Sequence, residues 1–407
     1  MATQARQLEI LRSICDLPTA PYCEQHVIAW LLAWAEKQGK AIKVRRDGVG
    51  NVYLEYRRGK AAKTPLVVEA HMDHPGFWVT GQKRDGRVEA EFRGGVKPSH
   101  FEKAGVRFWV NDPVAVGNVK PIAVKGRWVK TRVEGVKQVK GERVLRVTLA
   151  AVKEKLSTGT LGMWDLPDAA VGGRGNEKGQ VFAARVCDDL VGVAAIVCML
   201  EGLIAGKVEA HLIGLCSRAE EVGFAGVLAV CERRWIRKGS PVIGLETSKA
   251  SANAPQGGGP VIRVGDRTGV FSAGLTYFLS QTAVHIADED GSFKYQRKLM
   301  DGGMCNSTAF LAWGYDSAAM CVALGNYHNM AIRGEAGWKA AAGGKTGKGI
   351  ASETIHVGDF LGMVQILVEA GRRIGMYRPG FGVVKERLAK MHETEQKKML
   401  WATSDRA

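Results

Sequence analysis

The sequence predicts an α/β protein: a three-layer α/β/α sandwich interrupted by a small inserted all-β domain of barrel-like character. Apolar strand patterns alternate with helical patterns on both sides of residues 76–168, as in α/β sandwiches. Within 76–168, short Val-, Phe- and Trp-rich segments alternate with Gly and charged residues, which is typical of a small barrel. A chain of 407 residues is long enough for two domains. We therefore predict a main domain from residues 1–75 plus 169–407 and an inserted β domain from 76–168.

Helix and strand patterns follow one another through the first 75 residues. Apolar side chains recur at helical spacing in 4–15 and in 23–38, and Pro18 and Pro21 separate the two segments. Three β-like runs come next: 42–44, 52–56 and 65–70. The last run is apolar at nearly every position, as expected of a strand that is covered on both faces.

After residue 76 the sequence pattern changes from alternating helices and strands to short β-like segments, and it changes back after residue 168. The β-like segments of the insertion are 107–110, 114–116, 126–131 and 143–149. Gly172-Gly173-Arg174-Gly175 marks the linker back to the main domain. Helices are then expected at 191–203, 222–233, 304–313 and 357–374, and strands at 210–216, 241–246 and 317–324. We expect a loop over 335–350 and a charged, frayed helix in the tail 385–407.

Composition excludes some classes of protein. No apolar run is long enough to span a membrane, and the N-terminus lacks the apolar core of a signal peptide. The 8 cysteines are scattered without a Cys-x-x-Cys pair, which favours a reducing cytoplasm. The formal net charge is +16, but the basic residues are mostly dispersed and no basic helix or zinc finger accompanies them. The charge therefore indicates a solvated basic face and does not favour a nucleic-acid partner.

The adjacent acids Glu220 and Glu221 follow the apolar run that begins at His211. Two neighbouring carboxylates at the end of a buried strand repel each other unless a cation or a proton compensates for their charge. One carboxylate could bind a metal ion while the other acts as a general base. The alternative is a helix N-terminus, where acidic residues are also favoured.

Other acids and histidines fall at comparable places in the predicted sheet. Each lies at the end of a strand or at the start of a helix: His71 and Asp73, Asp188 and Asp189, Glu246, and His328. In an open α/β sheet, ligands bind at the carboxyl edge of the strands. Asp188 could instead merely cap its helix.

The residue types suggest which ions would bind. Histidines and carboxylates without Cys suit zinc, cobalt or manganese. Five ligands are too many for one tetrahedral site, but they fit two metal ions that share a bridging carboxylate and act on one water molecule.

Three short motifs, together with the His328 segment Gly325-Asn326-Tyr327-His328-Asn329, carry a family resemblance. Ala70-His71-Met72-Asp73-His74-Pro75-Gly76, Cys187-Asp188-Asp189 and Arg218-Ala219-Glu220-Glu221-Val222-Gly223 resemble, in this order, motifs of the M42 metallo-aminopeptidases. This family includes glutamyl aminopeptidases and tetrahedral aminopeptidases. The resemblance covers most of residues 1–380, including the position of the β insertion.

The resemblance implies a role for each site residue. One metal ion would be held by His71, Asp188 and Glu246, and the other by Asp188, Glu221 and His328. Glu220 would be the general base, and Asp73 would orient His71. The resemblance also implies a cis bond between Asp188 and Asp189, with Asp189 serving the backbone geometry and not ligation. For Arg218, balancing the acid cluster and contacting substrate both remain open.

The chain departs from the family pattern at three places. Glu246 stands where Asp is usual, and Asn306 stands where an acid is common, which would remove a charge near the site. A long segment separates His328 from Ser352-Glu353-Thr354-Ile355-His356, so His356 is an alternative to His328 as the ligand.

We therefore predict a cytoplasmic, two-metal aminopeptidase that acts on short peptides, with zinc as the expected ion. The resemblance also implies a homo-oligomer built from dimers, with 76–168 as the contact domain. A metal-dependent deacylase or carboxypeptidase on the same scaffold is the first alternative, because Glu246 is longer than Asp. A non-catalytic assembly protein whose basic surface binds acidic partners is the second.

Overall fold

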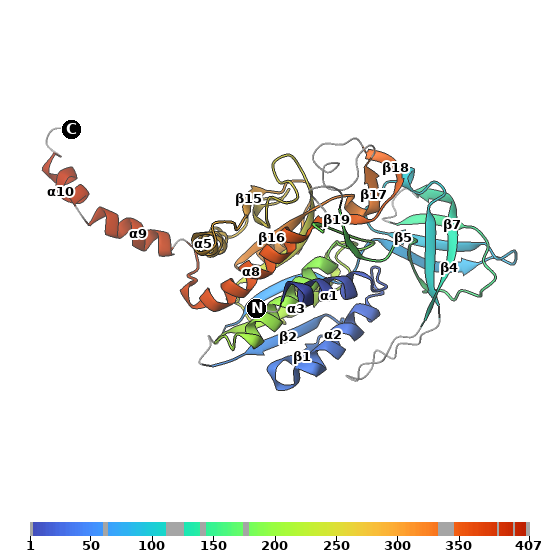
Figure 1. Cartoon of the computed structure of the whole chain (residues 1–407), viewed down its shortest axis with the longest axis horizontal. Coiled ribbons are helices and arrows are strands. Elements are labelled where there is room, and N and C mark those ends of the chain that lie inside the picture. The colour runs from blue at the N-terminus through green and yellow to red at the C-terminus, as the bar shows by residue number, and fades with distance from the viewer. Residues whose placement is uncertain are drawn as a thin grey trace.

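The chain folds into a mixed α/β body with a β-barrel at one end (Figure 1). This computed structural model describes residues 3–59, 64–110, 126–138, 144–173, 179–332, 346–380, 382–393 and 395–403. Its α-helices are α1 Gln4–Cys15, α2 Gln25–Gln38, α3 Leu190–Ala205, α4 Ala225–Arg233, α5 Ala273–Glu289, α6 Asn306–Ala312, α8 Val357–Arg373, α9 Gly382–His392 and α10 Glu395–Ala402. Its 3-10 turns are η1 Gly39–Ala41, η2 Pro98–His100, η4 Tyr327–Asn329 and η5 Ile374–Met376.

The strands form the central sheet, the barrel and two small sheets. They are β1 Lys43–Arg46, β2 Val52–Arg57, β3 Leu66–His71, β4 Gly76–Gln82, β5 Val88–Arg93, β6 Gly105–Val110, β7 Arg127–Gln138, β8 Leu145–Leu149, β9 Leu161–Trp164, β10 Ala170–Gly172, β11 Val181–Ala184, β12 His211–Ser217, β13 Val242–Lys249, β14 Val261–Gly265, β15 Gln296–Leu299, β16 Ser317–Leu324, β17 Met330–Ile332, β18 Thr346–Ile350 and β19 Glu353–His356.

The central sheet has 8 strands in the order β1-β2-β12-β3-β13-β16-β14-β15. The four middle strands β12, β3, β13 and β16 run parallel to one another. Their carboxyl ends therefore meet at one edge of the sheet, which is the edge where open α/β folds bind ligands.

Helices cover both faces of this sheet. Helices α1, α3, α5 and α8 pack together on one face, and α4 and α6 pack on the other. Neighbouring strand residues face opposite layers: Val68 belongs to the first apolar cluster and Val67 to the second. Double burial explains why the strand around Val67 is apolar at most positions. The three-layer sandwich predicted from the sequence is confirmed.

The inserted segment forms a closed six-stranded barrel in the order β4-β5-β8-β7-β6-β9, as the fold prediction anticipated. Side chains at every second position of β8, Leu145, Val147 and Leu149, point into its core. Aromatic rings fill the centre: Phe77 meets Trp164 edge to face with ring centroids 4.8 Å apart. These contacts give the barrel its own apolar core, separate from that of the sandwich.

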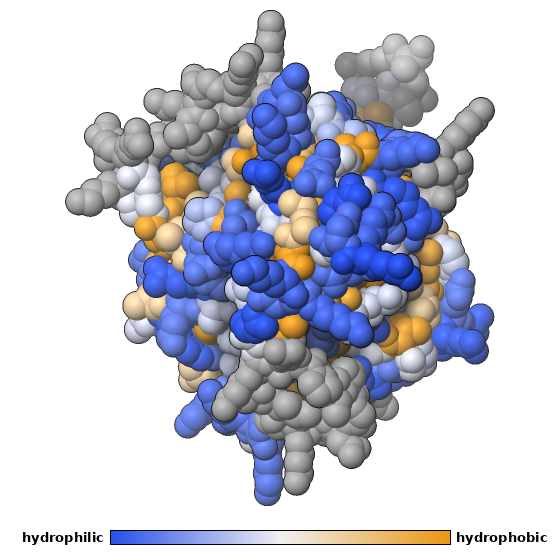
Figure 2. Space-filling model, turned by 90° about the vertical axis from the view of Figure 1, so that its right-hand side faces the viewer, coloured by the Kyte–Doolittle hydropathy of each residue, from blue (hydrophilic) through white to orange (hydrophobic). Residues whose placement is uncertain are grey.

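The end of the molecule that carries the barrel is mainly hydrophilic among its described residues (Figure 2). Many of its basic side chains pair with acids, including Lys83 with Glu89 and Arg146 with Glu91. These exposed pairs contribute little to stability but keep this face solvated.

Several predicted elements are corrected. Residues 346–350, expected within a loop, form β18, which pairs antiparallel with β17. Residues 333–345, the predicted strand 114–116 and the linker residues Arg174-Gly175 lie outside the described residues. Glu246 lies inside β13, which continues to Lys249, and not at its end. The loop prediction for 346–350 was wrong because a Gly- and Lys-rich segment has little strand propensity of its own. Its pairing with β17 determines its structure.

The charged tail forms two helices, α9 and α10, which project from the body at the end opposite the barrel (Figure 1). Leu388, Leu400 and Trp401 are exposed along them. None of the described helices is both long enough and apolar enough to cross a bilayer.

Candidate metal centre

The five predicted metal-binding residues come together at the carboxyl edge of the central sheet. His71 is the last residue of β3, and Glu246 lies in β13 beside it. Asp188 lies between β11 and α3, Glu221 in the turn after β12, and His328 in η4 after β16. His71, Glu221 and His328 meet because β3, β12 and β16 run parallel in the central sheet. Asp188 reaches the same edge from β11, which belongs to a separate small sheet.

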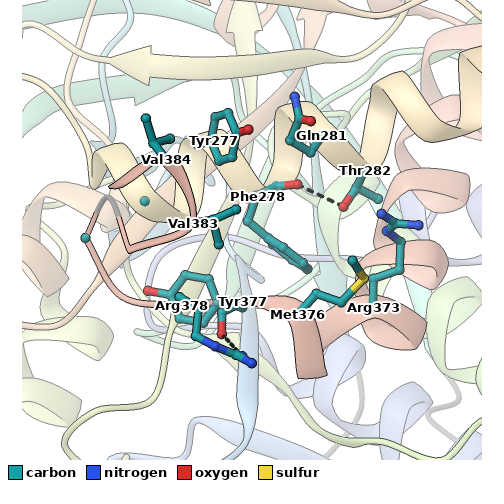
Figure 3. Close-up of a pocket in the computed structure, with 12 residues that line it drawn as sticks. Tyr277, Phe278, Gln281, Thr282, Arg373, Met376, Tyr377, Arg378, Val383 and Val384 are labelled. Carbon is teal, nitrogen blue, oxygen red and sulfur yellow. Dashed lines mark hydrogen bonds between the residues drawn. The ribbon is translucent and has the colours of Figure 1, made fainter. Parts of the chain in front are cut away.

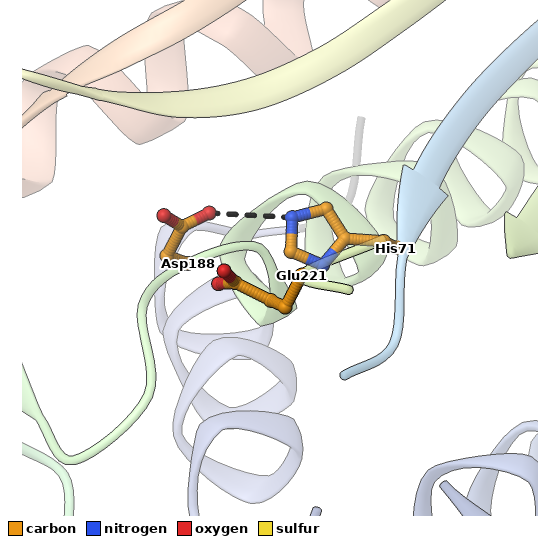
Figure 4. Close-up of side chains that lie close together, drawn as sticks. All are labelled: His71, Asp188 and Glu221. Carbon is orange, nitrogen blue, oxygen red and sulfur yellow. Dashed lines mark ion pairs between the residues drawn. The ribbon is translucent and has the colours of Figure 1, made fainter. Parts of the chain in front are cut away.

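Asp188 lies at the centre of the cluster and faces both imidazoles. Its Oδ1 is 3.3 Å from Nε2 of His71, and its Oδ2 is 3.4 Å from Nε2 of His328. Glu246 Oε1 is 3.9 Å from Nε2 of His71, whereas Glu221 Oε1 is 3.2 Å from Nε2 of His328. The His71 ring points at Asp188 with the Glu221 carboxylate beside it (Figure 4). Two groups of ligand atoms therefore share one carboxylate.

Hydrogen bonds at the far side of each imidazole select the tautomer that can bind a metal. Nδ1 of His71 lies 3.0 Å from the carbonyl oxygen of Asp73, and Nδ1 of His328 lies 3.0 Å from the carbonyl oxygen of Gly95. A carbonyl oxygen only accepts hydrogen bonds, so Nδ1 carries the proton in both rings. In the neutral rings, Nε2 then directs a lone pair at the carboxylates.

Burial makes the cluster costly without cations. His71, Asp188 and His328 are 1%, 2% and 4% exposed. Asp188 Oδ1 and Glu221 Oε1 are buried without a hydrogen-bond donor in the described part of the chain. Buried carboxylate oxygens of this kind require compensation by positive charge. The imidazole and carboxylate donors fit divalent ions such as zinc, cobalt or manganese.

Glu220 and Asp73 complete the site. The carboxylate of Asp73 accepts hydrogen bonds from the backbone N–H groups of Glu220 at 2.9 Å and Glu221 at 3.1 Å. Its Oδ1 is 3.5 Å from Nδ1 of His71, farther away than its own carbonyl oxygen. Asp73 therefore holds the paired-glutamate turn as well as the His71 ring. Burial, together with the neighbouring carboxylates, raises the pKa of Glu220 well above its ordinary value.

Asp189 caps α3, because its Oδ1 accepts a hydrogen bond from the N–H of Gly192 at 3.2 Å. A carboxylate oxygen of Asp189 also comes within 4.8 Å of ligand atoms of Asp188 and Glu246. The peptide bond between Asp188 and Asp189 is cis, as the resemblance implied.

His328, and not His356, faces the cluster. Nδ1 of His356 accepts a hydrogen bond from the N–H of Gly358 and caps α8. Nε2 of His356 lies 3.2 Å from the side-chain oxygen of Gln180. The structure thus places His328 with the other candidate ligands and His356 at a helix start.

Arg218 pairs with the buried acid Glu24, which lies in no motif of the sequence. Its Nε donates to Glu24 Oε2 at 2.7 Å, and its two terminal nitrogens donate to the carbonyl oxygens of Val49 and Tyr22. Glu24 Oε1 also accepts from the N–H of Ala219 at 3.0 Å. These contacts give Arg218 a role in supporting the paired-glutamate turn.

Asn306 donates a hydrogen bond to Oε1 of Glu69 at 2.8 Å, and Ser217 donates to the same oxygen at 2.6 Å. Glu69 is fully buried in β3. The expectation that Asn306 removes a charge near the site is therefore incomplete, since an acid from a neighbouring strand lies beside it. An acid within an otherwise apolar strand is the signal that could have identified Glu69.

A cavity of about 150 Å³ opens beside the candidate metal ligands, and Arg263 lines it. Arg263 is 2% exposed, and its Nε and Nη1 have no hydrogen-bond partner among the described residues. Burial alone would lower the pKa of the Arg263 guanidinium, but nearby acidic groups including Glu246 and Asp266 raise it. The side chain is therefore a buried cation with N–H groups to offer. Exposed Lys249 lines the same cavity.

A second pocket lies between α5, η5 and the start of α9 (Figure 3). Its lining includes Tyr277, Phe278, Met376 and Arg378 but no acid, histidine or cysteine. This pocket offers no carboxylate or imidazole, whereas the cavity beside Asp188 offers both.

Comparison with known proteins identifies the family. The sequence profile described as M42 glutamyl aminopeptidase matches residues 50–333, more than half of the chain. The chain belongs to the M42 peptidase family. This family is metal-dependent, and its members are aminopeptidases, which are hydrolases of peptide bonds. The predictions of family and of enzyme class are confirmed.

Relatives of this M42 chain agree with the assignment. Glutamyl aminopeptidase of Lactococcus lactis subsp. cremoris (strain MG1363) is 25% identical over 282 residues, which is 66% of this chain and 74% of that protein. Aminopeptidase APDkam598 of the archaeon Desulfurococcus kamchatkensis superposes with a TM-score of 0.67 at 18% identity, covering 90% of this chain and 94% of that one. Pyrococcus horikoshii TET1 peptidase superposes with a TM-score of 0.65 at 17% identity, covering 90% and 99%. These structural likenesses establish the fold.

Proposed function

We propose that this chain is a two-metal aminopeptidase that removes N-terminal residues from short peptides. The observation that carries the proposal is the carboxylate of Asp188, whose two oxygens face Nε2 atoms of two different histidines. His71, Asp188 and Glu246 would hold one ion, and Asp188, Glu221 and His328 the other, with zinc as the proposed ion. When bound, two such ions polarise a scissile carbonyl and acidify a water molecule.

Glu220 acts as the general base in this proposal. It takes a proton from the attacking water and passes it to the amine that leaves the peptide. Asp73 supports this role, because its carboxylate fixes the backbone of Glu220 through a 2.9 Å hydrogen bond. Asp73 also fixes the neighbouring Glu221. The base and a metal ligand are thus aligned by one side chain.

We propose further that acidic N-terminal residues are preferred. The buried Arg263 lines the cavity beside the cluster and has two nitrogens without partners in the described chain. A guanidinium pairs best with a carboxylate through parallel N–H bonds. A Glu or Asp side chain at the N-terminus of the substrate would supply that carboxylate.

A carboxypeptidase or deacylase is the second candidate, since Arg263 would also fit the terminal carboxylate of a substrate. Assays of aminoacyl anilides, N-acyl amino acids and peptides with blocked N-termini separate the possibilities. Cleavage of the anilides but not of the blocked substrates supports the aminopeptidase. The reverse pattern supports the second candidate.

The assembly and location of the chain are also proposals. Pyrococcus horikoshii TET1 peptidase is described as assembling into a tetrahedron or a large octahedral shell. We propose that this chain forms a homo-oligomer built from dimers, with 76–168 as the contact domain. All 8 cysteines are free and buried, which supports a reducing cytoplasm as the location.

Glu220→Gln tests the mechanism. It should lower kcat by roughly 10²–10⁴-fold, as loss of a general base does, while the metal content stays unchanged. Glu232→Gln, at an exposed position of α4, is the matched control and should keep full activity. Activity that survives the Glu220 change would show that another group takes the proton.

A further inference from the structure

One buried carboxylate connects the two chain segments that carry Asp188 and His328. Glu353 lies in β19 and is fully buried. Its Oε2 accepts hydrogen bonds from the N–H groups of Cys187 at 2.7 Å and Asp188 at 3.0 Å. Its Oε1 accepts from the N–H of His328 at 2.8 Å. A single side chain thus binds the backbone of two candidate metal ligands.

The strand that carries Glu353 lies between these two segments. On one side, β19 pairs antiparallel with β11, and Glu353 is opposite Ala184, just before the Asp188 turn. On the other side, Thr354 exchanges backbone hydrogen bonds with Gly325, just before the His328 turn. Glu353 therefore has the position and the length to span both turns.

The His328 turn needs such support. The backbone of Asn326, His328 and Asn329 lies in the left-handed region, with φ of 52°, 52° and 60°. That conformation costs roughly 1 kcal/mol per residue for residues other than glycine and persists only when the surroundings fix it. The bond from His328 N–H to Glu353 fixes the middle residue, which carries the ligand.

We propose that Glu353 is a positioning residue that sets the spacing between Asp188 and His328 and thereby the affinity for the metal ion on the His328 side. The inference rests on the proposed two-metal function. His71 and Glu246 come from strands that Glu353 does not touch, so the other ion should be affected less.

Glutamine cannot replace Glu353 in this role. Its amide has one accepting oxygen, and its NH₂ group would face a backbone N–H. Glu353→Gln must therefore lose the bonds to Cys187 and Asp188 or the bond to His328. Outer residues that orient metal ligands typically contribute about 10–100-fold to metal affinity.

The test is metal binding to the full chain without substrate. Protein stripped by a chelator is titrated with Co²⁺, followed by its visible absorption, and with Zn²⁺ against a competing chelator. Wild type should bind two ions. Glu353→Gln should bind the ion on the His328 side about 10–100-fold more weakly. The other ion shares Asp188, so its affinity should also fall, but by less.

Asp359→Asn is the matched control. Asp359 is also a buried carboxylate that accepts two backbone hydrogen bonds, from Gly257 and Gly259, but it does not line the cavity at the metal cluster. This variant should bind both ions as wild type does, whatever its thermal stability. If Glu353→Gln does not fold, Glu353→Asp carries the same expectation, because its shorter side chain cannot reach both turns.

Wild-type affinity for both ions in a folded Glu353 variant would overturn the inference. An equal loss of affinity in Asp359→Asn would also overturn it, since the effect would then be one of general stability. The proposed function fails by a different result: two bound ions in wild type without hydrolysis of any aminoacyl substrate.

Discussion

Replacing Arg263 should remove the proposed preference for acidic substrates while leaving the hydrolytic machinery intact. Arg263 lines the cavity beside Asp188, and none of the candidate metal ligands is its hydrogen-bond partner. Its one hydrogen bond to a described residue goes to the carbonyl oxygen of Met300 at 3.4 Å. Methionine at position 263 would fill most of the same space without charge or donors.

The size of the effect follows from burial. Arg263 is 2% exposed, so a carboxylate that pairs with its guanidinium does so away from water. Removing one partner from a buried, hydrogen-bonded charge pair costs about 2–5 kcal/mol. At about 1.4 kcal/mol per tenfold change, even the lower limit is roughly a 30-fold loss in kcat/KM for Glu and Asp substrates. Uncharged substrates never formed the pair, so their kcat/KM should change only a few-fold.

The assay compares kcat/KM for glutamyl, aspartyl, leucyl and alanyl p-nitroanilides in wild type and Arg263→Met. Arg267→Met, at an exposed position nearby, is the control and should leave all four values unchanged. An equal loss for all four substrates would show that Arg263 supports the fold and does not contact the substrate. If Arg263→Met still prefers glutamyl and aspartyl substrates, Arg263 does not recognise the acidic side chain. If Lys249→Met loses that preference instead, Lys249 is the residue that recognises it.

Two further predictions concern stability and assembly. Burial lowers the pKa of His26 to about 4 from 6.5, so this ring is neutral in the folded chain and takes up a proton on unfolding below pH 6.5. The stability that the neutral ring contributes is present above pH 6.5 and should be lost as the pH falls towards 4, by about 3 kcal/mol between pH 7 and pH 4. Urea denaturation of wild type and His26→Leu across this range measures the free energy of unfolding of each at each pH. A difference between the two proteins that does not change with pH would contradict the prediction. Strands β4 and β9 pair with each other, so a short linker can replace the barrel between Gly76 and Trp164. Light scattering of this deletion variant should give a smaller assembly than that of the full chain. An unchanged particle mass would contradict the role of the barrel in contacts between copies.

Much of the secondary structure could be predicted because local spacing carries it. The predicted helix 4–15 and strand 317–324 match α1 and β16 at both ends. The helix α5 was missed, although Leu275, Leu279 and Ile286 recur at helical spacing after the capping residue Ser272. The short strands β14 and β15 were missed because their few residues carry little pattern beyond what their neighbours impose.

Some site residues can be identified from their neighbours in the sequence, and others only from contacts with distant parts of the chain. His71, Asp188 and Glu220 lie in short motifs where neighbouring positions identify them. Glu353 and Glu24 act through hydrogen bonds to residues 165 and 195 positions away, and no local pattern records such partners. Arg263 is one arginine among many until its burial and its partnerless nitrogens are seen.

The order of the motifs and the two periodicities by themselves determined the class of fold, the barrel insertion and the kinds of atoms offered to a metal. Only the folded chain reveals that Asp188 lies between two imidazoles and that His328, not His356, joins it. The same holds for the buried carboxylates that fix the turns. The reason is physical: periodicity and motifs are properties of adjacent residues, whereas distances between strand ends depend on how the parallel strands are ordered in the sheet.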